Sequence, residues 1–228
     1  MSDKPAVDVS AGTKKVGRPT NPDLVSRRKR QILTKSAEIF AAQGYRQTDV
    51  QTIADQLNIG KGTIYRYFPS KKLLFLSVVD HGMRGLLKTV EHDMEAFTDP
   101  LMRVARAVLS YLTYFDRNPA LVELLIQERA EFRNREKPTY FLHQASRLER
   151  WHQAMRNLIN KGLAREMAVD TMFDTLSNLL YGTMFTNFFK GREKSVAQQA
   201  QDILDIFFNG ILIKPFNPEV LLRFEEDP

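Results

Sequence analysis

The sequence contains no cysteine in 228 residues, so it forms neither a disulfide nor a thiolate metal site. Its amino-terminal stretch, "MSDKPAVDVSAGTKK", has no apolar h-region, and we therefore expect no secretory signal. The densest apolar run, "LLFLSVV", is far too short to cross a bilayer. From these absences we expect a cytoplasmic protein without a membrane partner.

The spacings that metal and catalytic sites require are also missing. The four histidines include no pair four residues apart, the spacing that places two ligands on one helix face; they are His81, His92, His143 and His152. There is no glycine-rich phosphate loop and no Ser/His/Asp order in a strand context. We therefore predict no metal, no cofactor and no enzymatic activity.

The basic excess lies at one end of the chain. The net charge is +6, and residues 1–80 carry 14 Lys and Arg against 7 Asp and Glu, whereas the remainder carries 19 against 20. This asymmetry points to nucleic acid or an anionic surface as a partner of the first third. A basic face that is merely solvated is the alternative.

Residues 1–20 are polar and lack an apolar period, which predicts a disordered basic arm. Asn21, Pro22 and Asp23 form a helix start, and Gly44 follows the last periodic residue as a left-handed cap. From residue 70 onward nearly every segment has helical periodicity. We expect about nine helices, no strand and an all-α fold.

Two short helices follow the first one. "TDVQ" (Thr48–Gln51) has the pattern of a capping box, and Asn58–Gly60 predicts a tight turn. A helix over Lys61–Phe68 is ended by Pro69. Two short helices joined by a glycine-containing turn form a helix-turn-helix, whose second helix enters the DNA major groove.

A helical wheel of that second helix separates an inner from an outer side. Ile64 and Phe68 point inward, and the outer residues are Gly62, Thr63 and Arg66, with Tyr65 and Tyr67 on the flanks. A small amino terminus allows close approach to bases, and the tyrosine hydroxyls reach phosphates. In the alternative, both tyrosines are core aromatics.

The next helix begins against local preference. Ser70 is placed to cap it, yet Lys71 and Lys72 occupy its first turn, where the helix dipole favours acids. A DNA phosphate reverses this penalty, because the helix terminus and the lysines then bind the same anion. A solvated helix end is the alternative.

The stretch "TDVQTIADQLNIGKGTIYRYFPSKKLL" (48–74), with "ILTKSAEIFAAQGY" (32–45) before it, resembles the DNA-binding region of the TetR/AcrR family of transcriptional regulators. The resemblance implies base contacts from Gln51, Gly62 and Thr63. It implies phosphate contacts from Thr48, Tyr65, Tyr67 and Lys71, and we add Lys61 and Arg66 to this second set. The family usually has Gly-Val-Ser in the turn, where this chain has Asn58-Ile59-Gly60.

The basic arm carries a separate signal. "KKVGRPT" (14–20) resembles half of an AT-hook, with Val16 where the full core has a second arginine. In such a core the arginine lies in a narrow minor groove, which would assign Arg18 to DNA. A solubilising tail is the alternative.

The resemblance further implies that residues 21–70 form the helix-turn-helix domain and residues 71–228 a helical domain for ligand binding and dimerisation. The second region is rich in Met and aromatic residues, which favours an apolar or aromatic effector. Candidate pocket residues are Tyr111, Phe115, Phe141, Trp151, Met155 and Phe173; a plain hydrophobic core is the alternative.

The last two long helices are heavily apolar and predict a four-helix dimer interface with a second copy. Its candidate residues are Gly182, Phe185, Phe189, Ala200 and Phe207, and an intrachain core is the alternative. The charged stretch "QERAEFRNREKP" (127–138) offers an anion site through Arg129, Arg133 and Arg135, although its interleaved acids favour a self-paired loop.

Taken as a whole, the sequence predicts a homodimeric regulator, most simply a repressor, that a small apolar effector releases from a palindromic operator. A helical adaptor or DNA-associated scaffold of the same fold, without an effector, is the rival interpretation.

Overall fold

The computed structural model describes residues 22–212 and residue 214, and all its regular structure is helical. The described residues form ten helices: α1 (Pro22–Gln43), α2 (Val50–Gln56), α3 (Lys61–Tyr67), α4 (Lys71–Glu95), α5 (Pro100–Arg117), α6 (Pro119–Glu131), α7 (Thr139–Ala145), α8 (Leu148–Asn160), α9 (Val169–Lys190) and α10 (Val196–Ile211). The all-α prediction is confirmed. The helix beyond the expected nine arises because α7 and α8 separate at Ser146–Arg147, where neither glycine nor proline marks a break.

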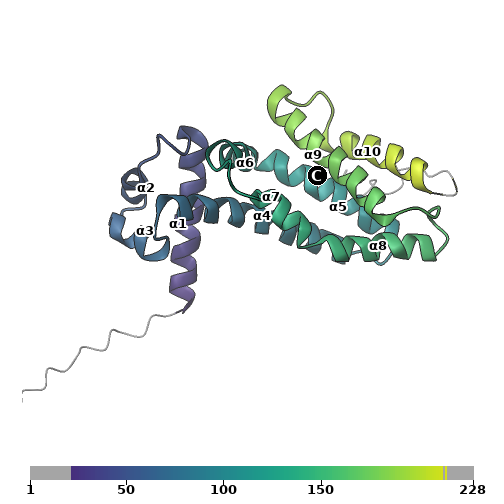
Figure 1. Cartoon of the computed structure of the whole chain (residues 1–228), viewed down its shortest axis with the longest axis horizontal. Helices are drawn as coiled ribbons and strands as arrows, with labels where there is room; N and C mark the ends of the chain where they lie inside the picture. Colours follow the sequence, from purple (N-terminus) through teal and green to yellow (C-terminus); the bar gives the residue numbers. More distant parts are fainter. Residues whose placement is uncertain (1–21, 213, 215–228) are drawn as a thin grey trace, which may run out of the picture.

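Figure 1 shows α1–α3 gathered at one end of the molecule and α8–α10 at the other, with α4 running between them. α5 packs against α4, α9 and α10, and α6 packs against α1 and α4. One continuous hydrophobic core therefore extends from Ile53 in α2 to Phe208 in α10. The predicted arm, including Arg18, lies outside the described residues.

The end of α1 follows its sequence signal. Gly44 has φ +82°, a left-handed conformation that glycine adopts without steric cost, and its N–H donates to the Phe40 carbonyl at 2.9 Å. Asn58, in the turn before α3, has φ 51° as its residue type allows. These two residues set the angles at which α1, α2 and α3 meet.

The predicted cap of α2 is wrong by one residue. Asp49 caps the helix, and its Oδ1 accepts from the Gln51 N–H at 2.9 Å. Thr48 is 1% exposed, and its hydroxyl donates to the Gly44 carbonyl at 2.8 Å. The Thr48 side chain therefore points back to the end of α1 rather than forward to α2.

α4 begins with a serine cap, as predicted, since Ser70 Oγ accepts from the Leu73 N–H at 3.1 Å. Two glycines lie in the interior of this helix, where glycine usually costs about 1 kcal/mol relative to alanine. A Cβ at Gly82 would lie 2.6 Å from Leu121 Cδ1, and one at Gly85 would lie 2.3 Å from the Tyr114 hydroxyl. The glycines thus permit α5 and α6 to approach α4 closely.

Candidate nucleic-acid interface and ligand cavity

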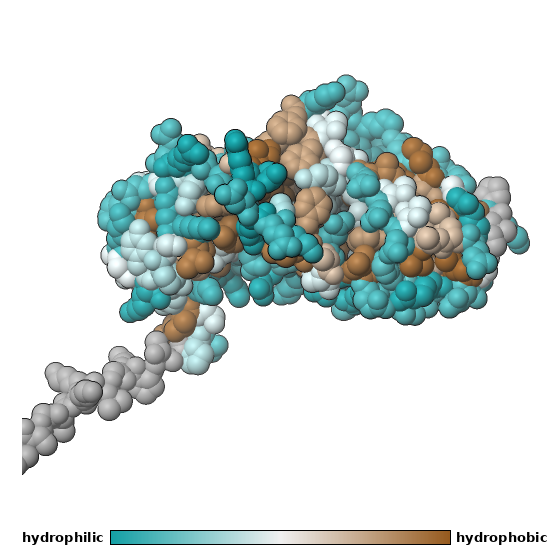
Figure 2. Space-filling model, viewed as in Figure 1, coloured by the Kyte–Doolittle hydropathy of each residue, from teal (hydrophilic) through white to brown (hydrophobic). Residues whose placement is uncertain are grey.

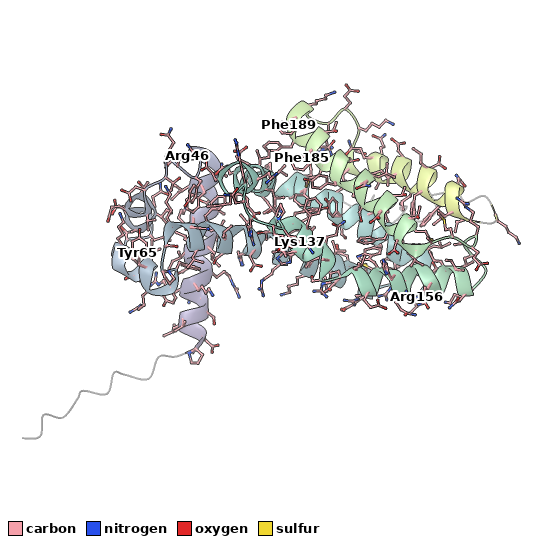
Figure 3. The ribbon with its side chains drawn as sticks, viewed as in Figure 1. Arg46, Tyr65, Lys137, Arg156, Phe185 and Phe189 are labelled. Carbon is pink, nitrogen blue, oxygen red and sulfur yellow. The ribbon has the colours of Figure 1, made fainter. Side chains whose placement is uncertain are left out.

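α3 is anchored on one side and free on the other. Ile64 is fully buried and Phe68 is nearly so, whereas Gly62, Tyr65 and Arg66 are exposed. Thr63 and Tyr67 are half-buried at the margins of the exposed side. Figure 3 shows Tyr65 on the outer surface of this end of the molecule. Of the two tyrosines, Tyr65 is 38% exposed and is not a core aromatic, whereas the half-buried Tyr67 packs against the core.

Gly62 has open space around it. A Cβ at this position would meet no atom within 4 Å, so intrachain packing does not require glycine here. Because glycine has no side chain, nothing projects from the outer surface of α3 at this residue of its amino-terminal turn. A helix surface without a projecting side chain suits close approach of a base edge.

Two of the predicted DNA contacts have polar partners in the free protein. Lys61 Nζ lies 2.8 Å from Asp49 Oδ1, and Gln51 Nε2 donates to Asp55 Oδ1 at 2.7 Å. The N–H of Gln51, and secondly Lys61, lower the pKa of Asp49. Because these contacts are solvent-exposed, they are worth little and can be exchanged for contacts to DNA.

Lys71 is held at the start of α4 by the segment that follows α1. Its Nζ donates to the Arg46 carbonyl at 3.0 Å and lies 4.8 Å from the ring centroid of Tyr45. Partial burial lowers the pKa of the Lys71 ammonium. The side chain is therefore oriented toward α1 rather than extended into solvent.

The sequence reasoning missed an aromatic cluster that joins this end of the molecule to α6. Four rings form this cluster, and their centroids lie 5.0–6.1 Å apart in five pairs; they belong to Phe40, Tyr45, Phe75 and Phe132. Arg46 Nε donates to both carboxylate oxygens of Glu131 at the end of α6, at 2.8 and 3.0 Å. The aromatic content of these segments could have indicated a cluster, but no local spacing in the sequence indicates that Phe132 contacts Phe75.

Thr48 does not join the exposed set. Its side chain is buried and its hydroxyl hydrogen is committed to Gly44. The structure thus brings Gly62, Thr63, Tyr65 and Arg66 to one surface of α3, with Gln51, Lys61, Tyr67 and Lys71 around it, and sets Thr48 beneath.

A second feature is a partly open cavity of about 100 Å³ between α4, α5, α7, α8 and α9, called the internal cavity below. Three of the six predicted pocket residues line it, namely Tyr111, Trp151 and Phe173. The other three lie elsewhere: Met155 is fully buried, and Phe115 and Phe141 line separate depressions. Sequence reasoning missed the wall that α4 contributes, which consists of Met83, Leu86, Leu87 and Val90. The helical spacing of these apolar residues could have indicated that they share one buried side of the helix.

The polar groups of the cavity are mainly neutral or paired. The Tyr111 and Tyr140 hydroxyls are 2.9 Å apart, and burial raises the pKa of Tyr111 well above its usual value and that of Tyr140 to about 12. Arg147 pairs with Glu91, and His143 Nε2 lies 2.9 Å from Asp80 Oδ1 on α4. The cavity is thus apolar with a few hydroxyl, amide and imidazole groups.

Comparison with known proteins identifies the end of the molecule that α1–α3 form, called the reading end below. Residues 32–78 match the family model "Bacterial regulatory proteins, tetR family". This segment comprises the second half of α1, α2, α3 and the first turns of α4. Residues 32–78 therefore form a TetR-family amino-terminal domain.

Two curated transcriptional regulators resemble about two fifths of this chain. It is 33% identical to the transcriptional regulator HbdR of Aromatoleum sp. strain CIB over 102 residues, 42% of each chain. It is 29% identical to the transcriptional repressor KstR of Mycobacterium tuberculosis over 98 residues, 43% of this chain and 44% of KstR. The chain thus matches somewhat less than half the length of these relatives.

The fold resemblance extends further than the sequence resemblance. The TetR-family regulator PfmR of Thermus thermophilus superposes with a TM-score of 0.63 at 22% identity, covering 78% of this chain and 97% of PfmR. Both the helix-turn-helix end and the larger helical part therefore have the TetR-family fold.

The predicted dimer residues divide into two groups. Ala200 and Phe207 are buried within the chain, so for these two the intrachain alternative holds. Gly182 and Phe189 are exposed on α9, and Phe185 is half-buried beside them. The exposed apolar residue on α10 is instead Ile206, at 67%. Amide pairing between Asn187 and Gln199, 2.8 Å in both directions, fixes α9 against α10.

Metal-ligand clusters of three or more His, Cys, Asp or Glu residues are absent from the part of the chain that the structure describes. Within the same residues, no helix combines the length and apolarity that a membrane span requires.

Proposed function

We propose that the protein is a sequence-specific transcriptional regulator that binds double-stranded DNA as a homodimer and is released by a small apolar effector. The observation that carries this proposal is the exposed outer surface of α3, anchored by Ile64 and Phe68 within a TetR-family domain. No catalytic step is assigned to any residue. The protein acts in the cytoplasm, where its DNA lies.

Base discrimination is assigned to Gln51, Gly62 and Thr63. Gly62 leaves room for the bases, and Thr63 and Gln51 supply hydrogen-bonding groups at the edge of the same surface. Phosphates are bound by the flanking residues Lys61, Tyr65, Arg66, Tyr67 and Lys71. The buried Thr48 supports the backbone between α1 and α2 instead of binding phosphate.

Dimerisation is assigned to the outer surface of α9 and α10. Gly182 permits close helix approach, and Phe189 and Ile206 supply apolar area that a monomer exposes to water. Two-fold symmetry places two α3 helices on two half-sites, which accounts for a palindromic operator.

The effector binds in the cavity that Tyr111, Trp151 and Phe173 line. Its apolar walls favour a small hydrophobic or aromatic molecule, since Arg147, the one arginine among the described residues that line it, is already paired with Glu91. The cavity of about 100 Å³ is small, so side chains must move to admit a larger ligand.

α4 connects the cavity to the reading end. Met83, Leu86, Leu87 and Val90 line the cavity from this helix, and its first turn carries Lys71, which is assigned to phosphate binding. An effector that prefers the dimer with wrongly spaced α3 helices lowers operator affinity by its differential affinity for the two states. KstR, which is similar over 43% of this chain, is named a repressor, and repression by occupying a promoter is the simplest action of such a dimer.

A genome-wide binding map tests this proposal against a DNA-associated scaffold. A regulator occupies few sites, located in promoters, and loses them when Thr63 and Lys71 are both replaced by alanine. Uniform coating of the chromosome would support the scaffold, and absence of DNA retention would reject both.

A further inference from the structure

The charged loop between α6 and α7 is only partly self-paired. Arg135 pairs with the buried carboxylate of Glu128, which also accepts from the Thr139 N–H at 3.0 Å and from its hydroxyl at 2.7 Å. Glu131 is taken by Arg46. Glu128 and Glu131 are therefore each committed to one arginine, and the third carboxylate of the stretch, Glu136, is exposed and forms no ion pair among the described residues.

Arg129 and Arg133 have no carboxylate partner among the described residues. One guanidinium nitrogen of Arg129 donates to the backbone carbonyl of Arg133 at 3.0 Å, and both side chains are exposed. The guanidinium groups keep most of their donors free. Two unpaired positive charges thus lie four residues apart at the end of α6.

These arginines border an apolar groove of about 540 Å³ between α6, α7 and α9. Its apolar walls include Leu125, Ile126, Tyr140, Phe141, Tyr181 and Phe185. The Tyr181 ring lies 5.6 Å from that of Phe141 and 4.8 Å from that of Phe185, so the aromatic wall is continuous. Figure 2 shows brown and tan side chains gathered near the α6 end of α9, beside strongly hydrophilic ones, and Figure 3 shows Phe185 there.

Exposed aromatic walls beside unpaired guanidinium groups suit a ligand with an apolar body and an anionic end. Burial of the body removes apolar surface from water, and a carboxylate accepts paired N–H bonds from arginine. The groove volume falls in the range of small-molecule sites, about 300–1,000 Å³. We propose that this groove is a second binding site, for an amphipathic organic anion such as an aryl-alkyl carboxylate.

The groove is distinct from the internal cavity. Tyr140 forms a wall of both, and its hydroxyl is bound to Tyr111 on the cavity side. Arg147, the arginine that lines the cavity, is paired with Glu91, whereas the groove has two unpaired ones among the described residues. The two sites therefore select differently, a neutral hydrophobe inside and an anion outside, and the groove site does not depend on the proposed DNA function.

The test is calorimetric titration of the DNA-free, full-length protein with 6-phenylhexanoate and with its neutral analogue, 6-phenylhexan-1-ol. We expect the acid to bind at least about tenfold more tightly than the alcohol, the difference that charge-assisted hydrogen bonds provide. Arg133→Gln, which removes no side-chain hydrogen bond or ion pair within the described part of the chain, lowers the affinity for the acid by about threefold to tenfold. The double variant with Arg129→Gln removes the preference for the acid.

Controls separate the groove from other binders. Arg156→Gln removes a charge on α8, whose partner is the exposed Glu149, and leaves the affinity for the acid unchanged. Ala107→Leu narrows the internal cavity and likewise leaves the affinity for the acid unchanged. Thermal melting shows that each variant is folded.

Three results would overturn the proposal: equal affinity of the unmodified protein for acid and alcohol, a preference for the acid that survives the double variant, or acid binding that Ala107→Leu abolishes. If a second copy of the chain fills the groove, the double variant changes dimer dissociation and leaves ligand affinity unaltered, which also refutes it. Failure of operator binding alone would reject the proposed function and leave these affinities as they are.

Discussion

The ammonium of Lys71 lies 4.8 Å from the ring centroid of Tyr45 and donates to the carbonyl of the next residue, Arg46. The ammonium of Lys71, at the start of α4, thus contacts the segment that follows α1. If Lys71 binds phosphate from this position, its charge contributes to affinity for every DNA sequence alike.

Replacing Lys71 by alanine should therefore weaken specific and random DNA equally and reduce the slope of log affinity against log salt by about one. Lys161→Ala is the matched control, because Lys161 is an exposed lysine that caps the end of α8, and α8 and α3 belong to opposite ends of the molecule (Figure 1). Fluorescence anisotropy over a range of salt concentrations measures both. An unchanged slope in Lys71→Ala would show that Lys71 binds no phosphate.

Thr63→Ala should act on sequence preference rather than on general affinity. We expect a loss of about 1–3 kcal/mol confined to one base position, because a base-edge contact carries discrimination. Tyr65→Phe removes one flanking hydroxyl and should weaken all sequences together. Dissociation constants against operators with single base changes distinguish the two, and a uniform loss from Thr63→Ala would contradict its assignment.

Gly85→Ala should destabilise the protein, because the new Cβ would lie 2.3 Å from the Tyr114 hydroxyl. Overpacking of this kind costs about 1–3 kcal/mol of unfolding free energy. Tyr114→Phe removes the clashing oxygen, so Gly85→Ala should cost less in that background. Gly210→Ala, where a Cβ meets nothing within 4 Å, is the control and should not destabilise in urea unfolding.

Ile206→Asp should dissociate the dimer, since it places a charge at the centre of the proposed apolar interface. Leu24→Asp, at a comparably exposed apolar residue of α1, should leave the dimer intact; the exposures are 67% and 63%. Sedimentation equilibrium without DNA measures the association. A dimer that persists in Ile206→Asp would move the interface away from α10.

Trp151 is the only tryptophan and lines the internal cavity. A hydrophobic effector should therefore change tryptophan emission at the same concentrations that release DNA. Ala107→Leu narrows the cavity and should weaken both responses together. Compounds that change the emission but leave DNA affinity unaltered would disconnect the cavity from regulation.

The helix-turn-helix end was predictable because its signals are local. Gly44, Pro69 and Ser70 define helix ends from their own backbone requirements, and Ile64 and Phe68 define the buried side of α3 by spacing. The cap of α2 was misplaced because Thr48 and Asp49 are adjacent and both suited to capping. Only the return of the Thr48 hydroxyl to Gly44 decides between them.

The cavity was much less predictable, because lining a cavity is a tertiary property. Met155 and Trp151 are both large apolar residues of the same helix, yet Met155 is fully buried and Trp151 lines the cavity. Likewise, Phe207 and Ile206 are neighbours of similar hydrophobicity. The packing of α10 against α5 and α9 turns Phe207 inward and Ile206 outward.

Selection of random double-stranded DNA by the purified full-length protein tests the central claim most directly. The account predicts enrichment of one inverted repeat, with Thr63→Ala relaxing the same position in both half-sites and Lys71→Ala leaving the sequence unchanged. Recovery of no common motif, or of a motif that Thr63→Ala does not alter, would contradict reading of DNA by the exposed surface of α3.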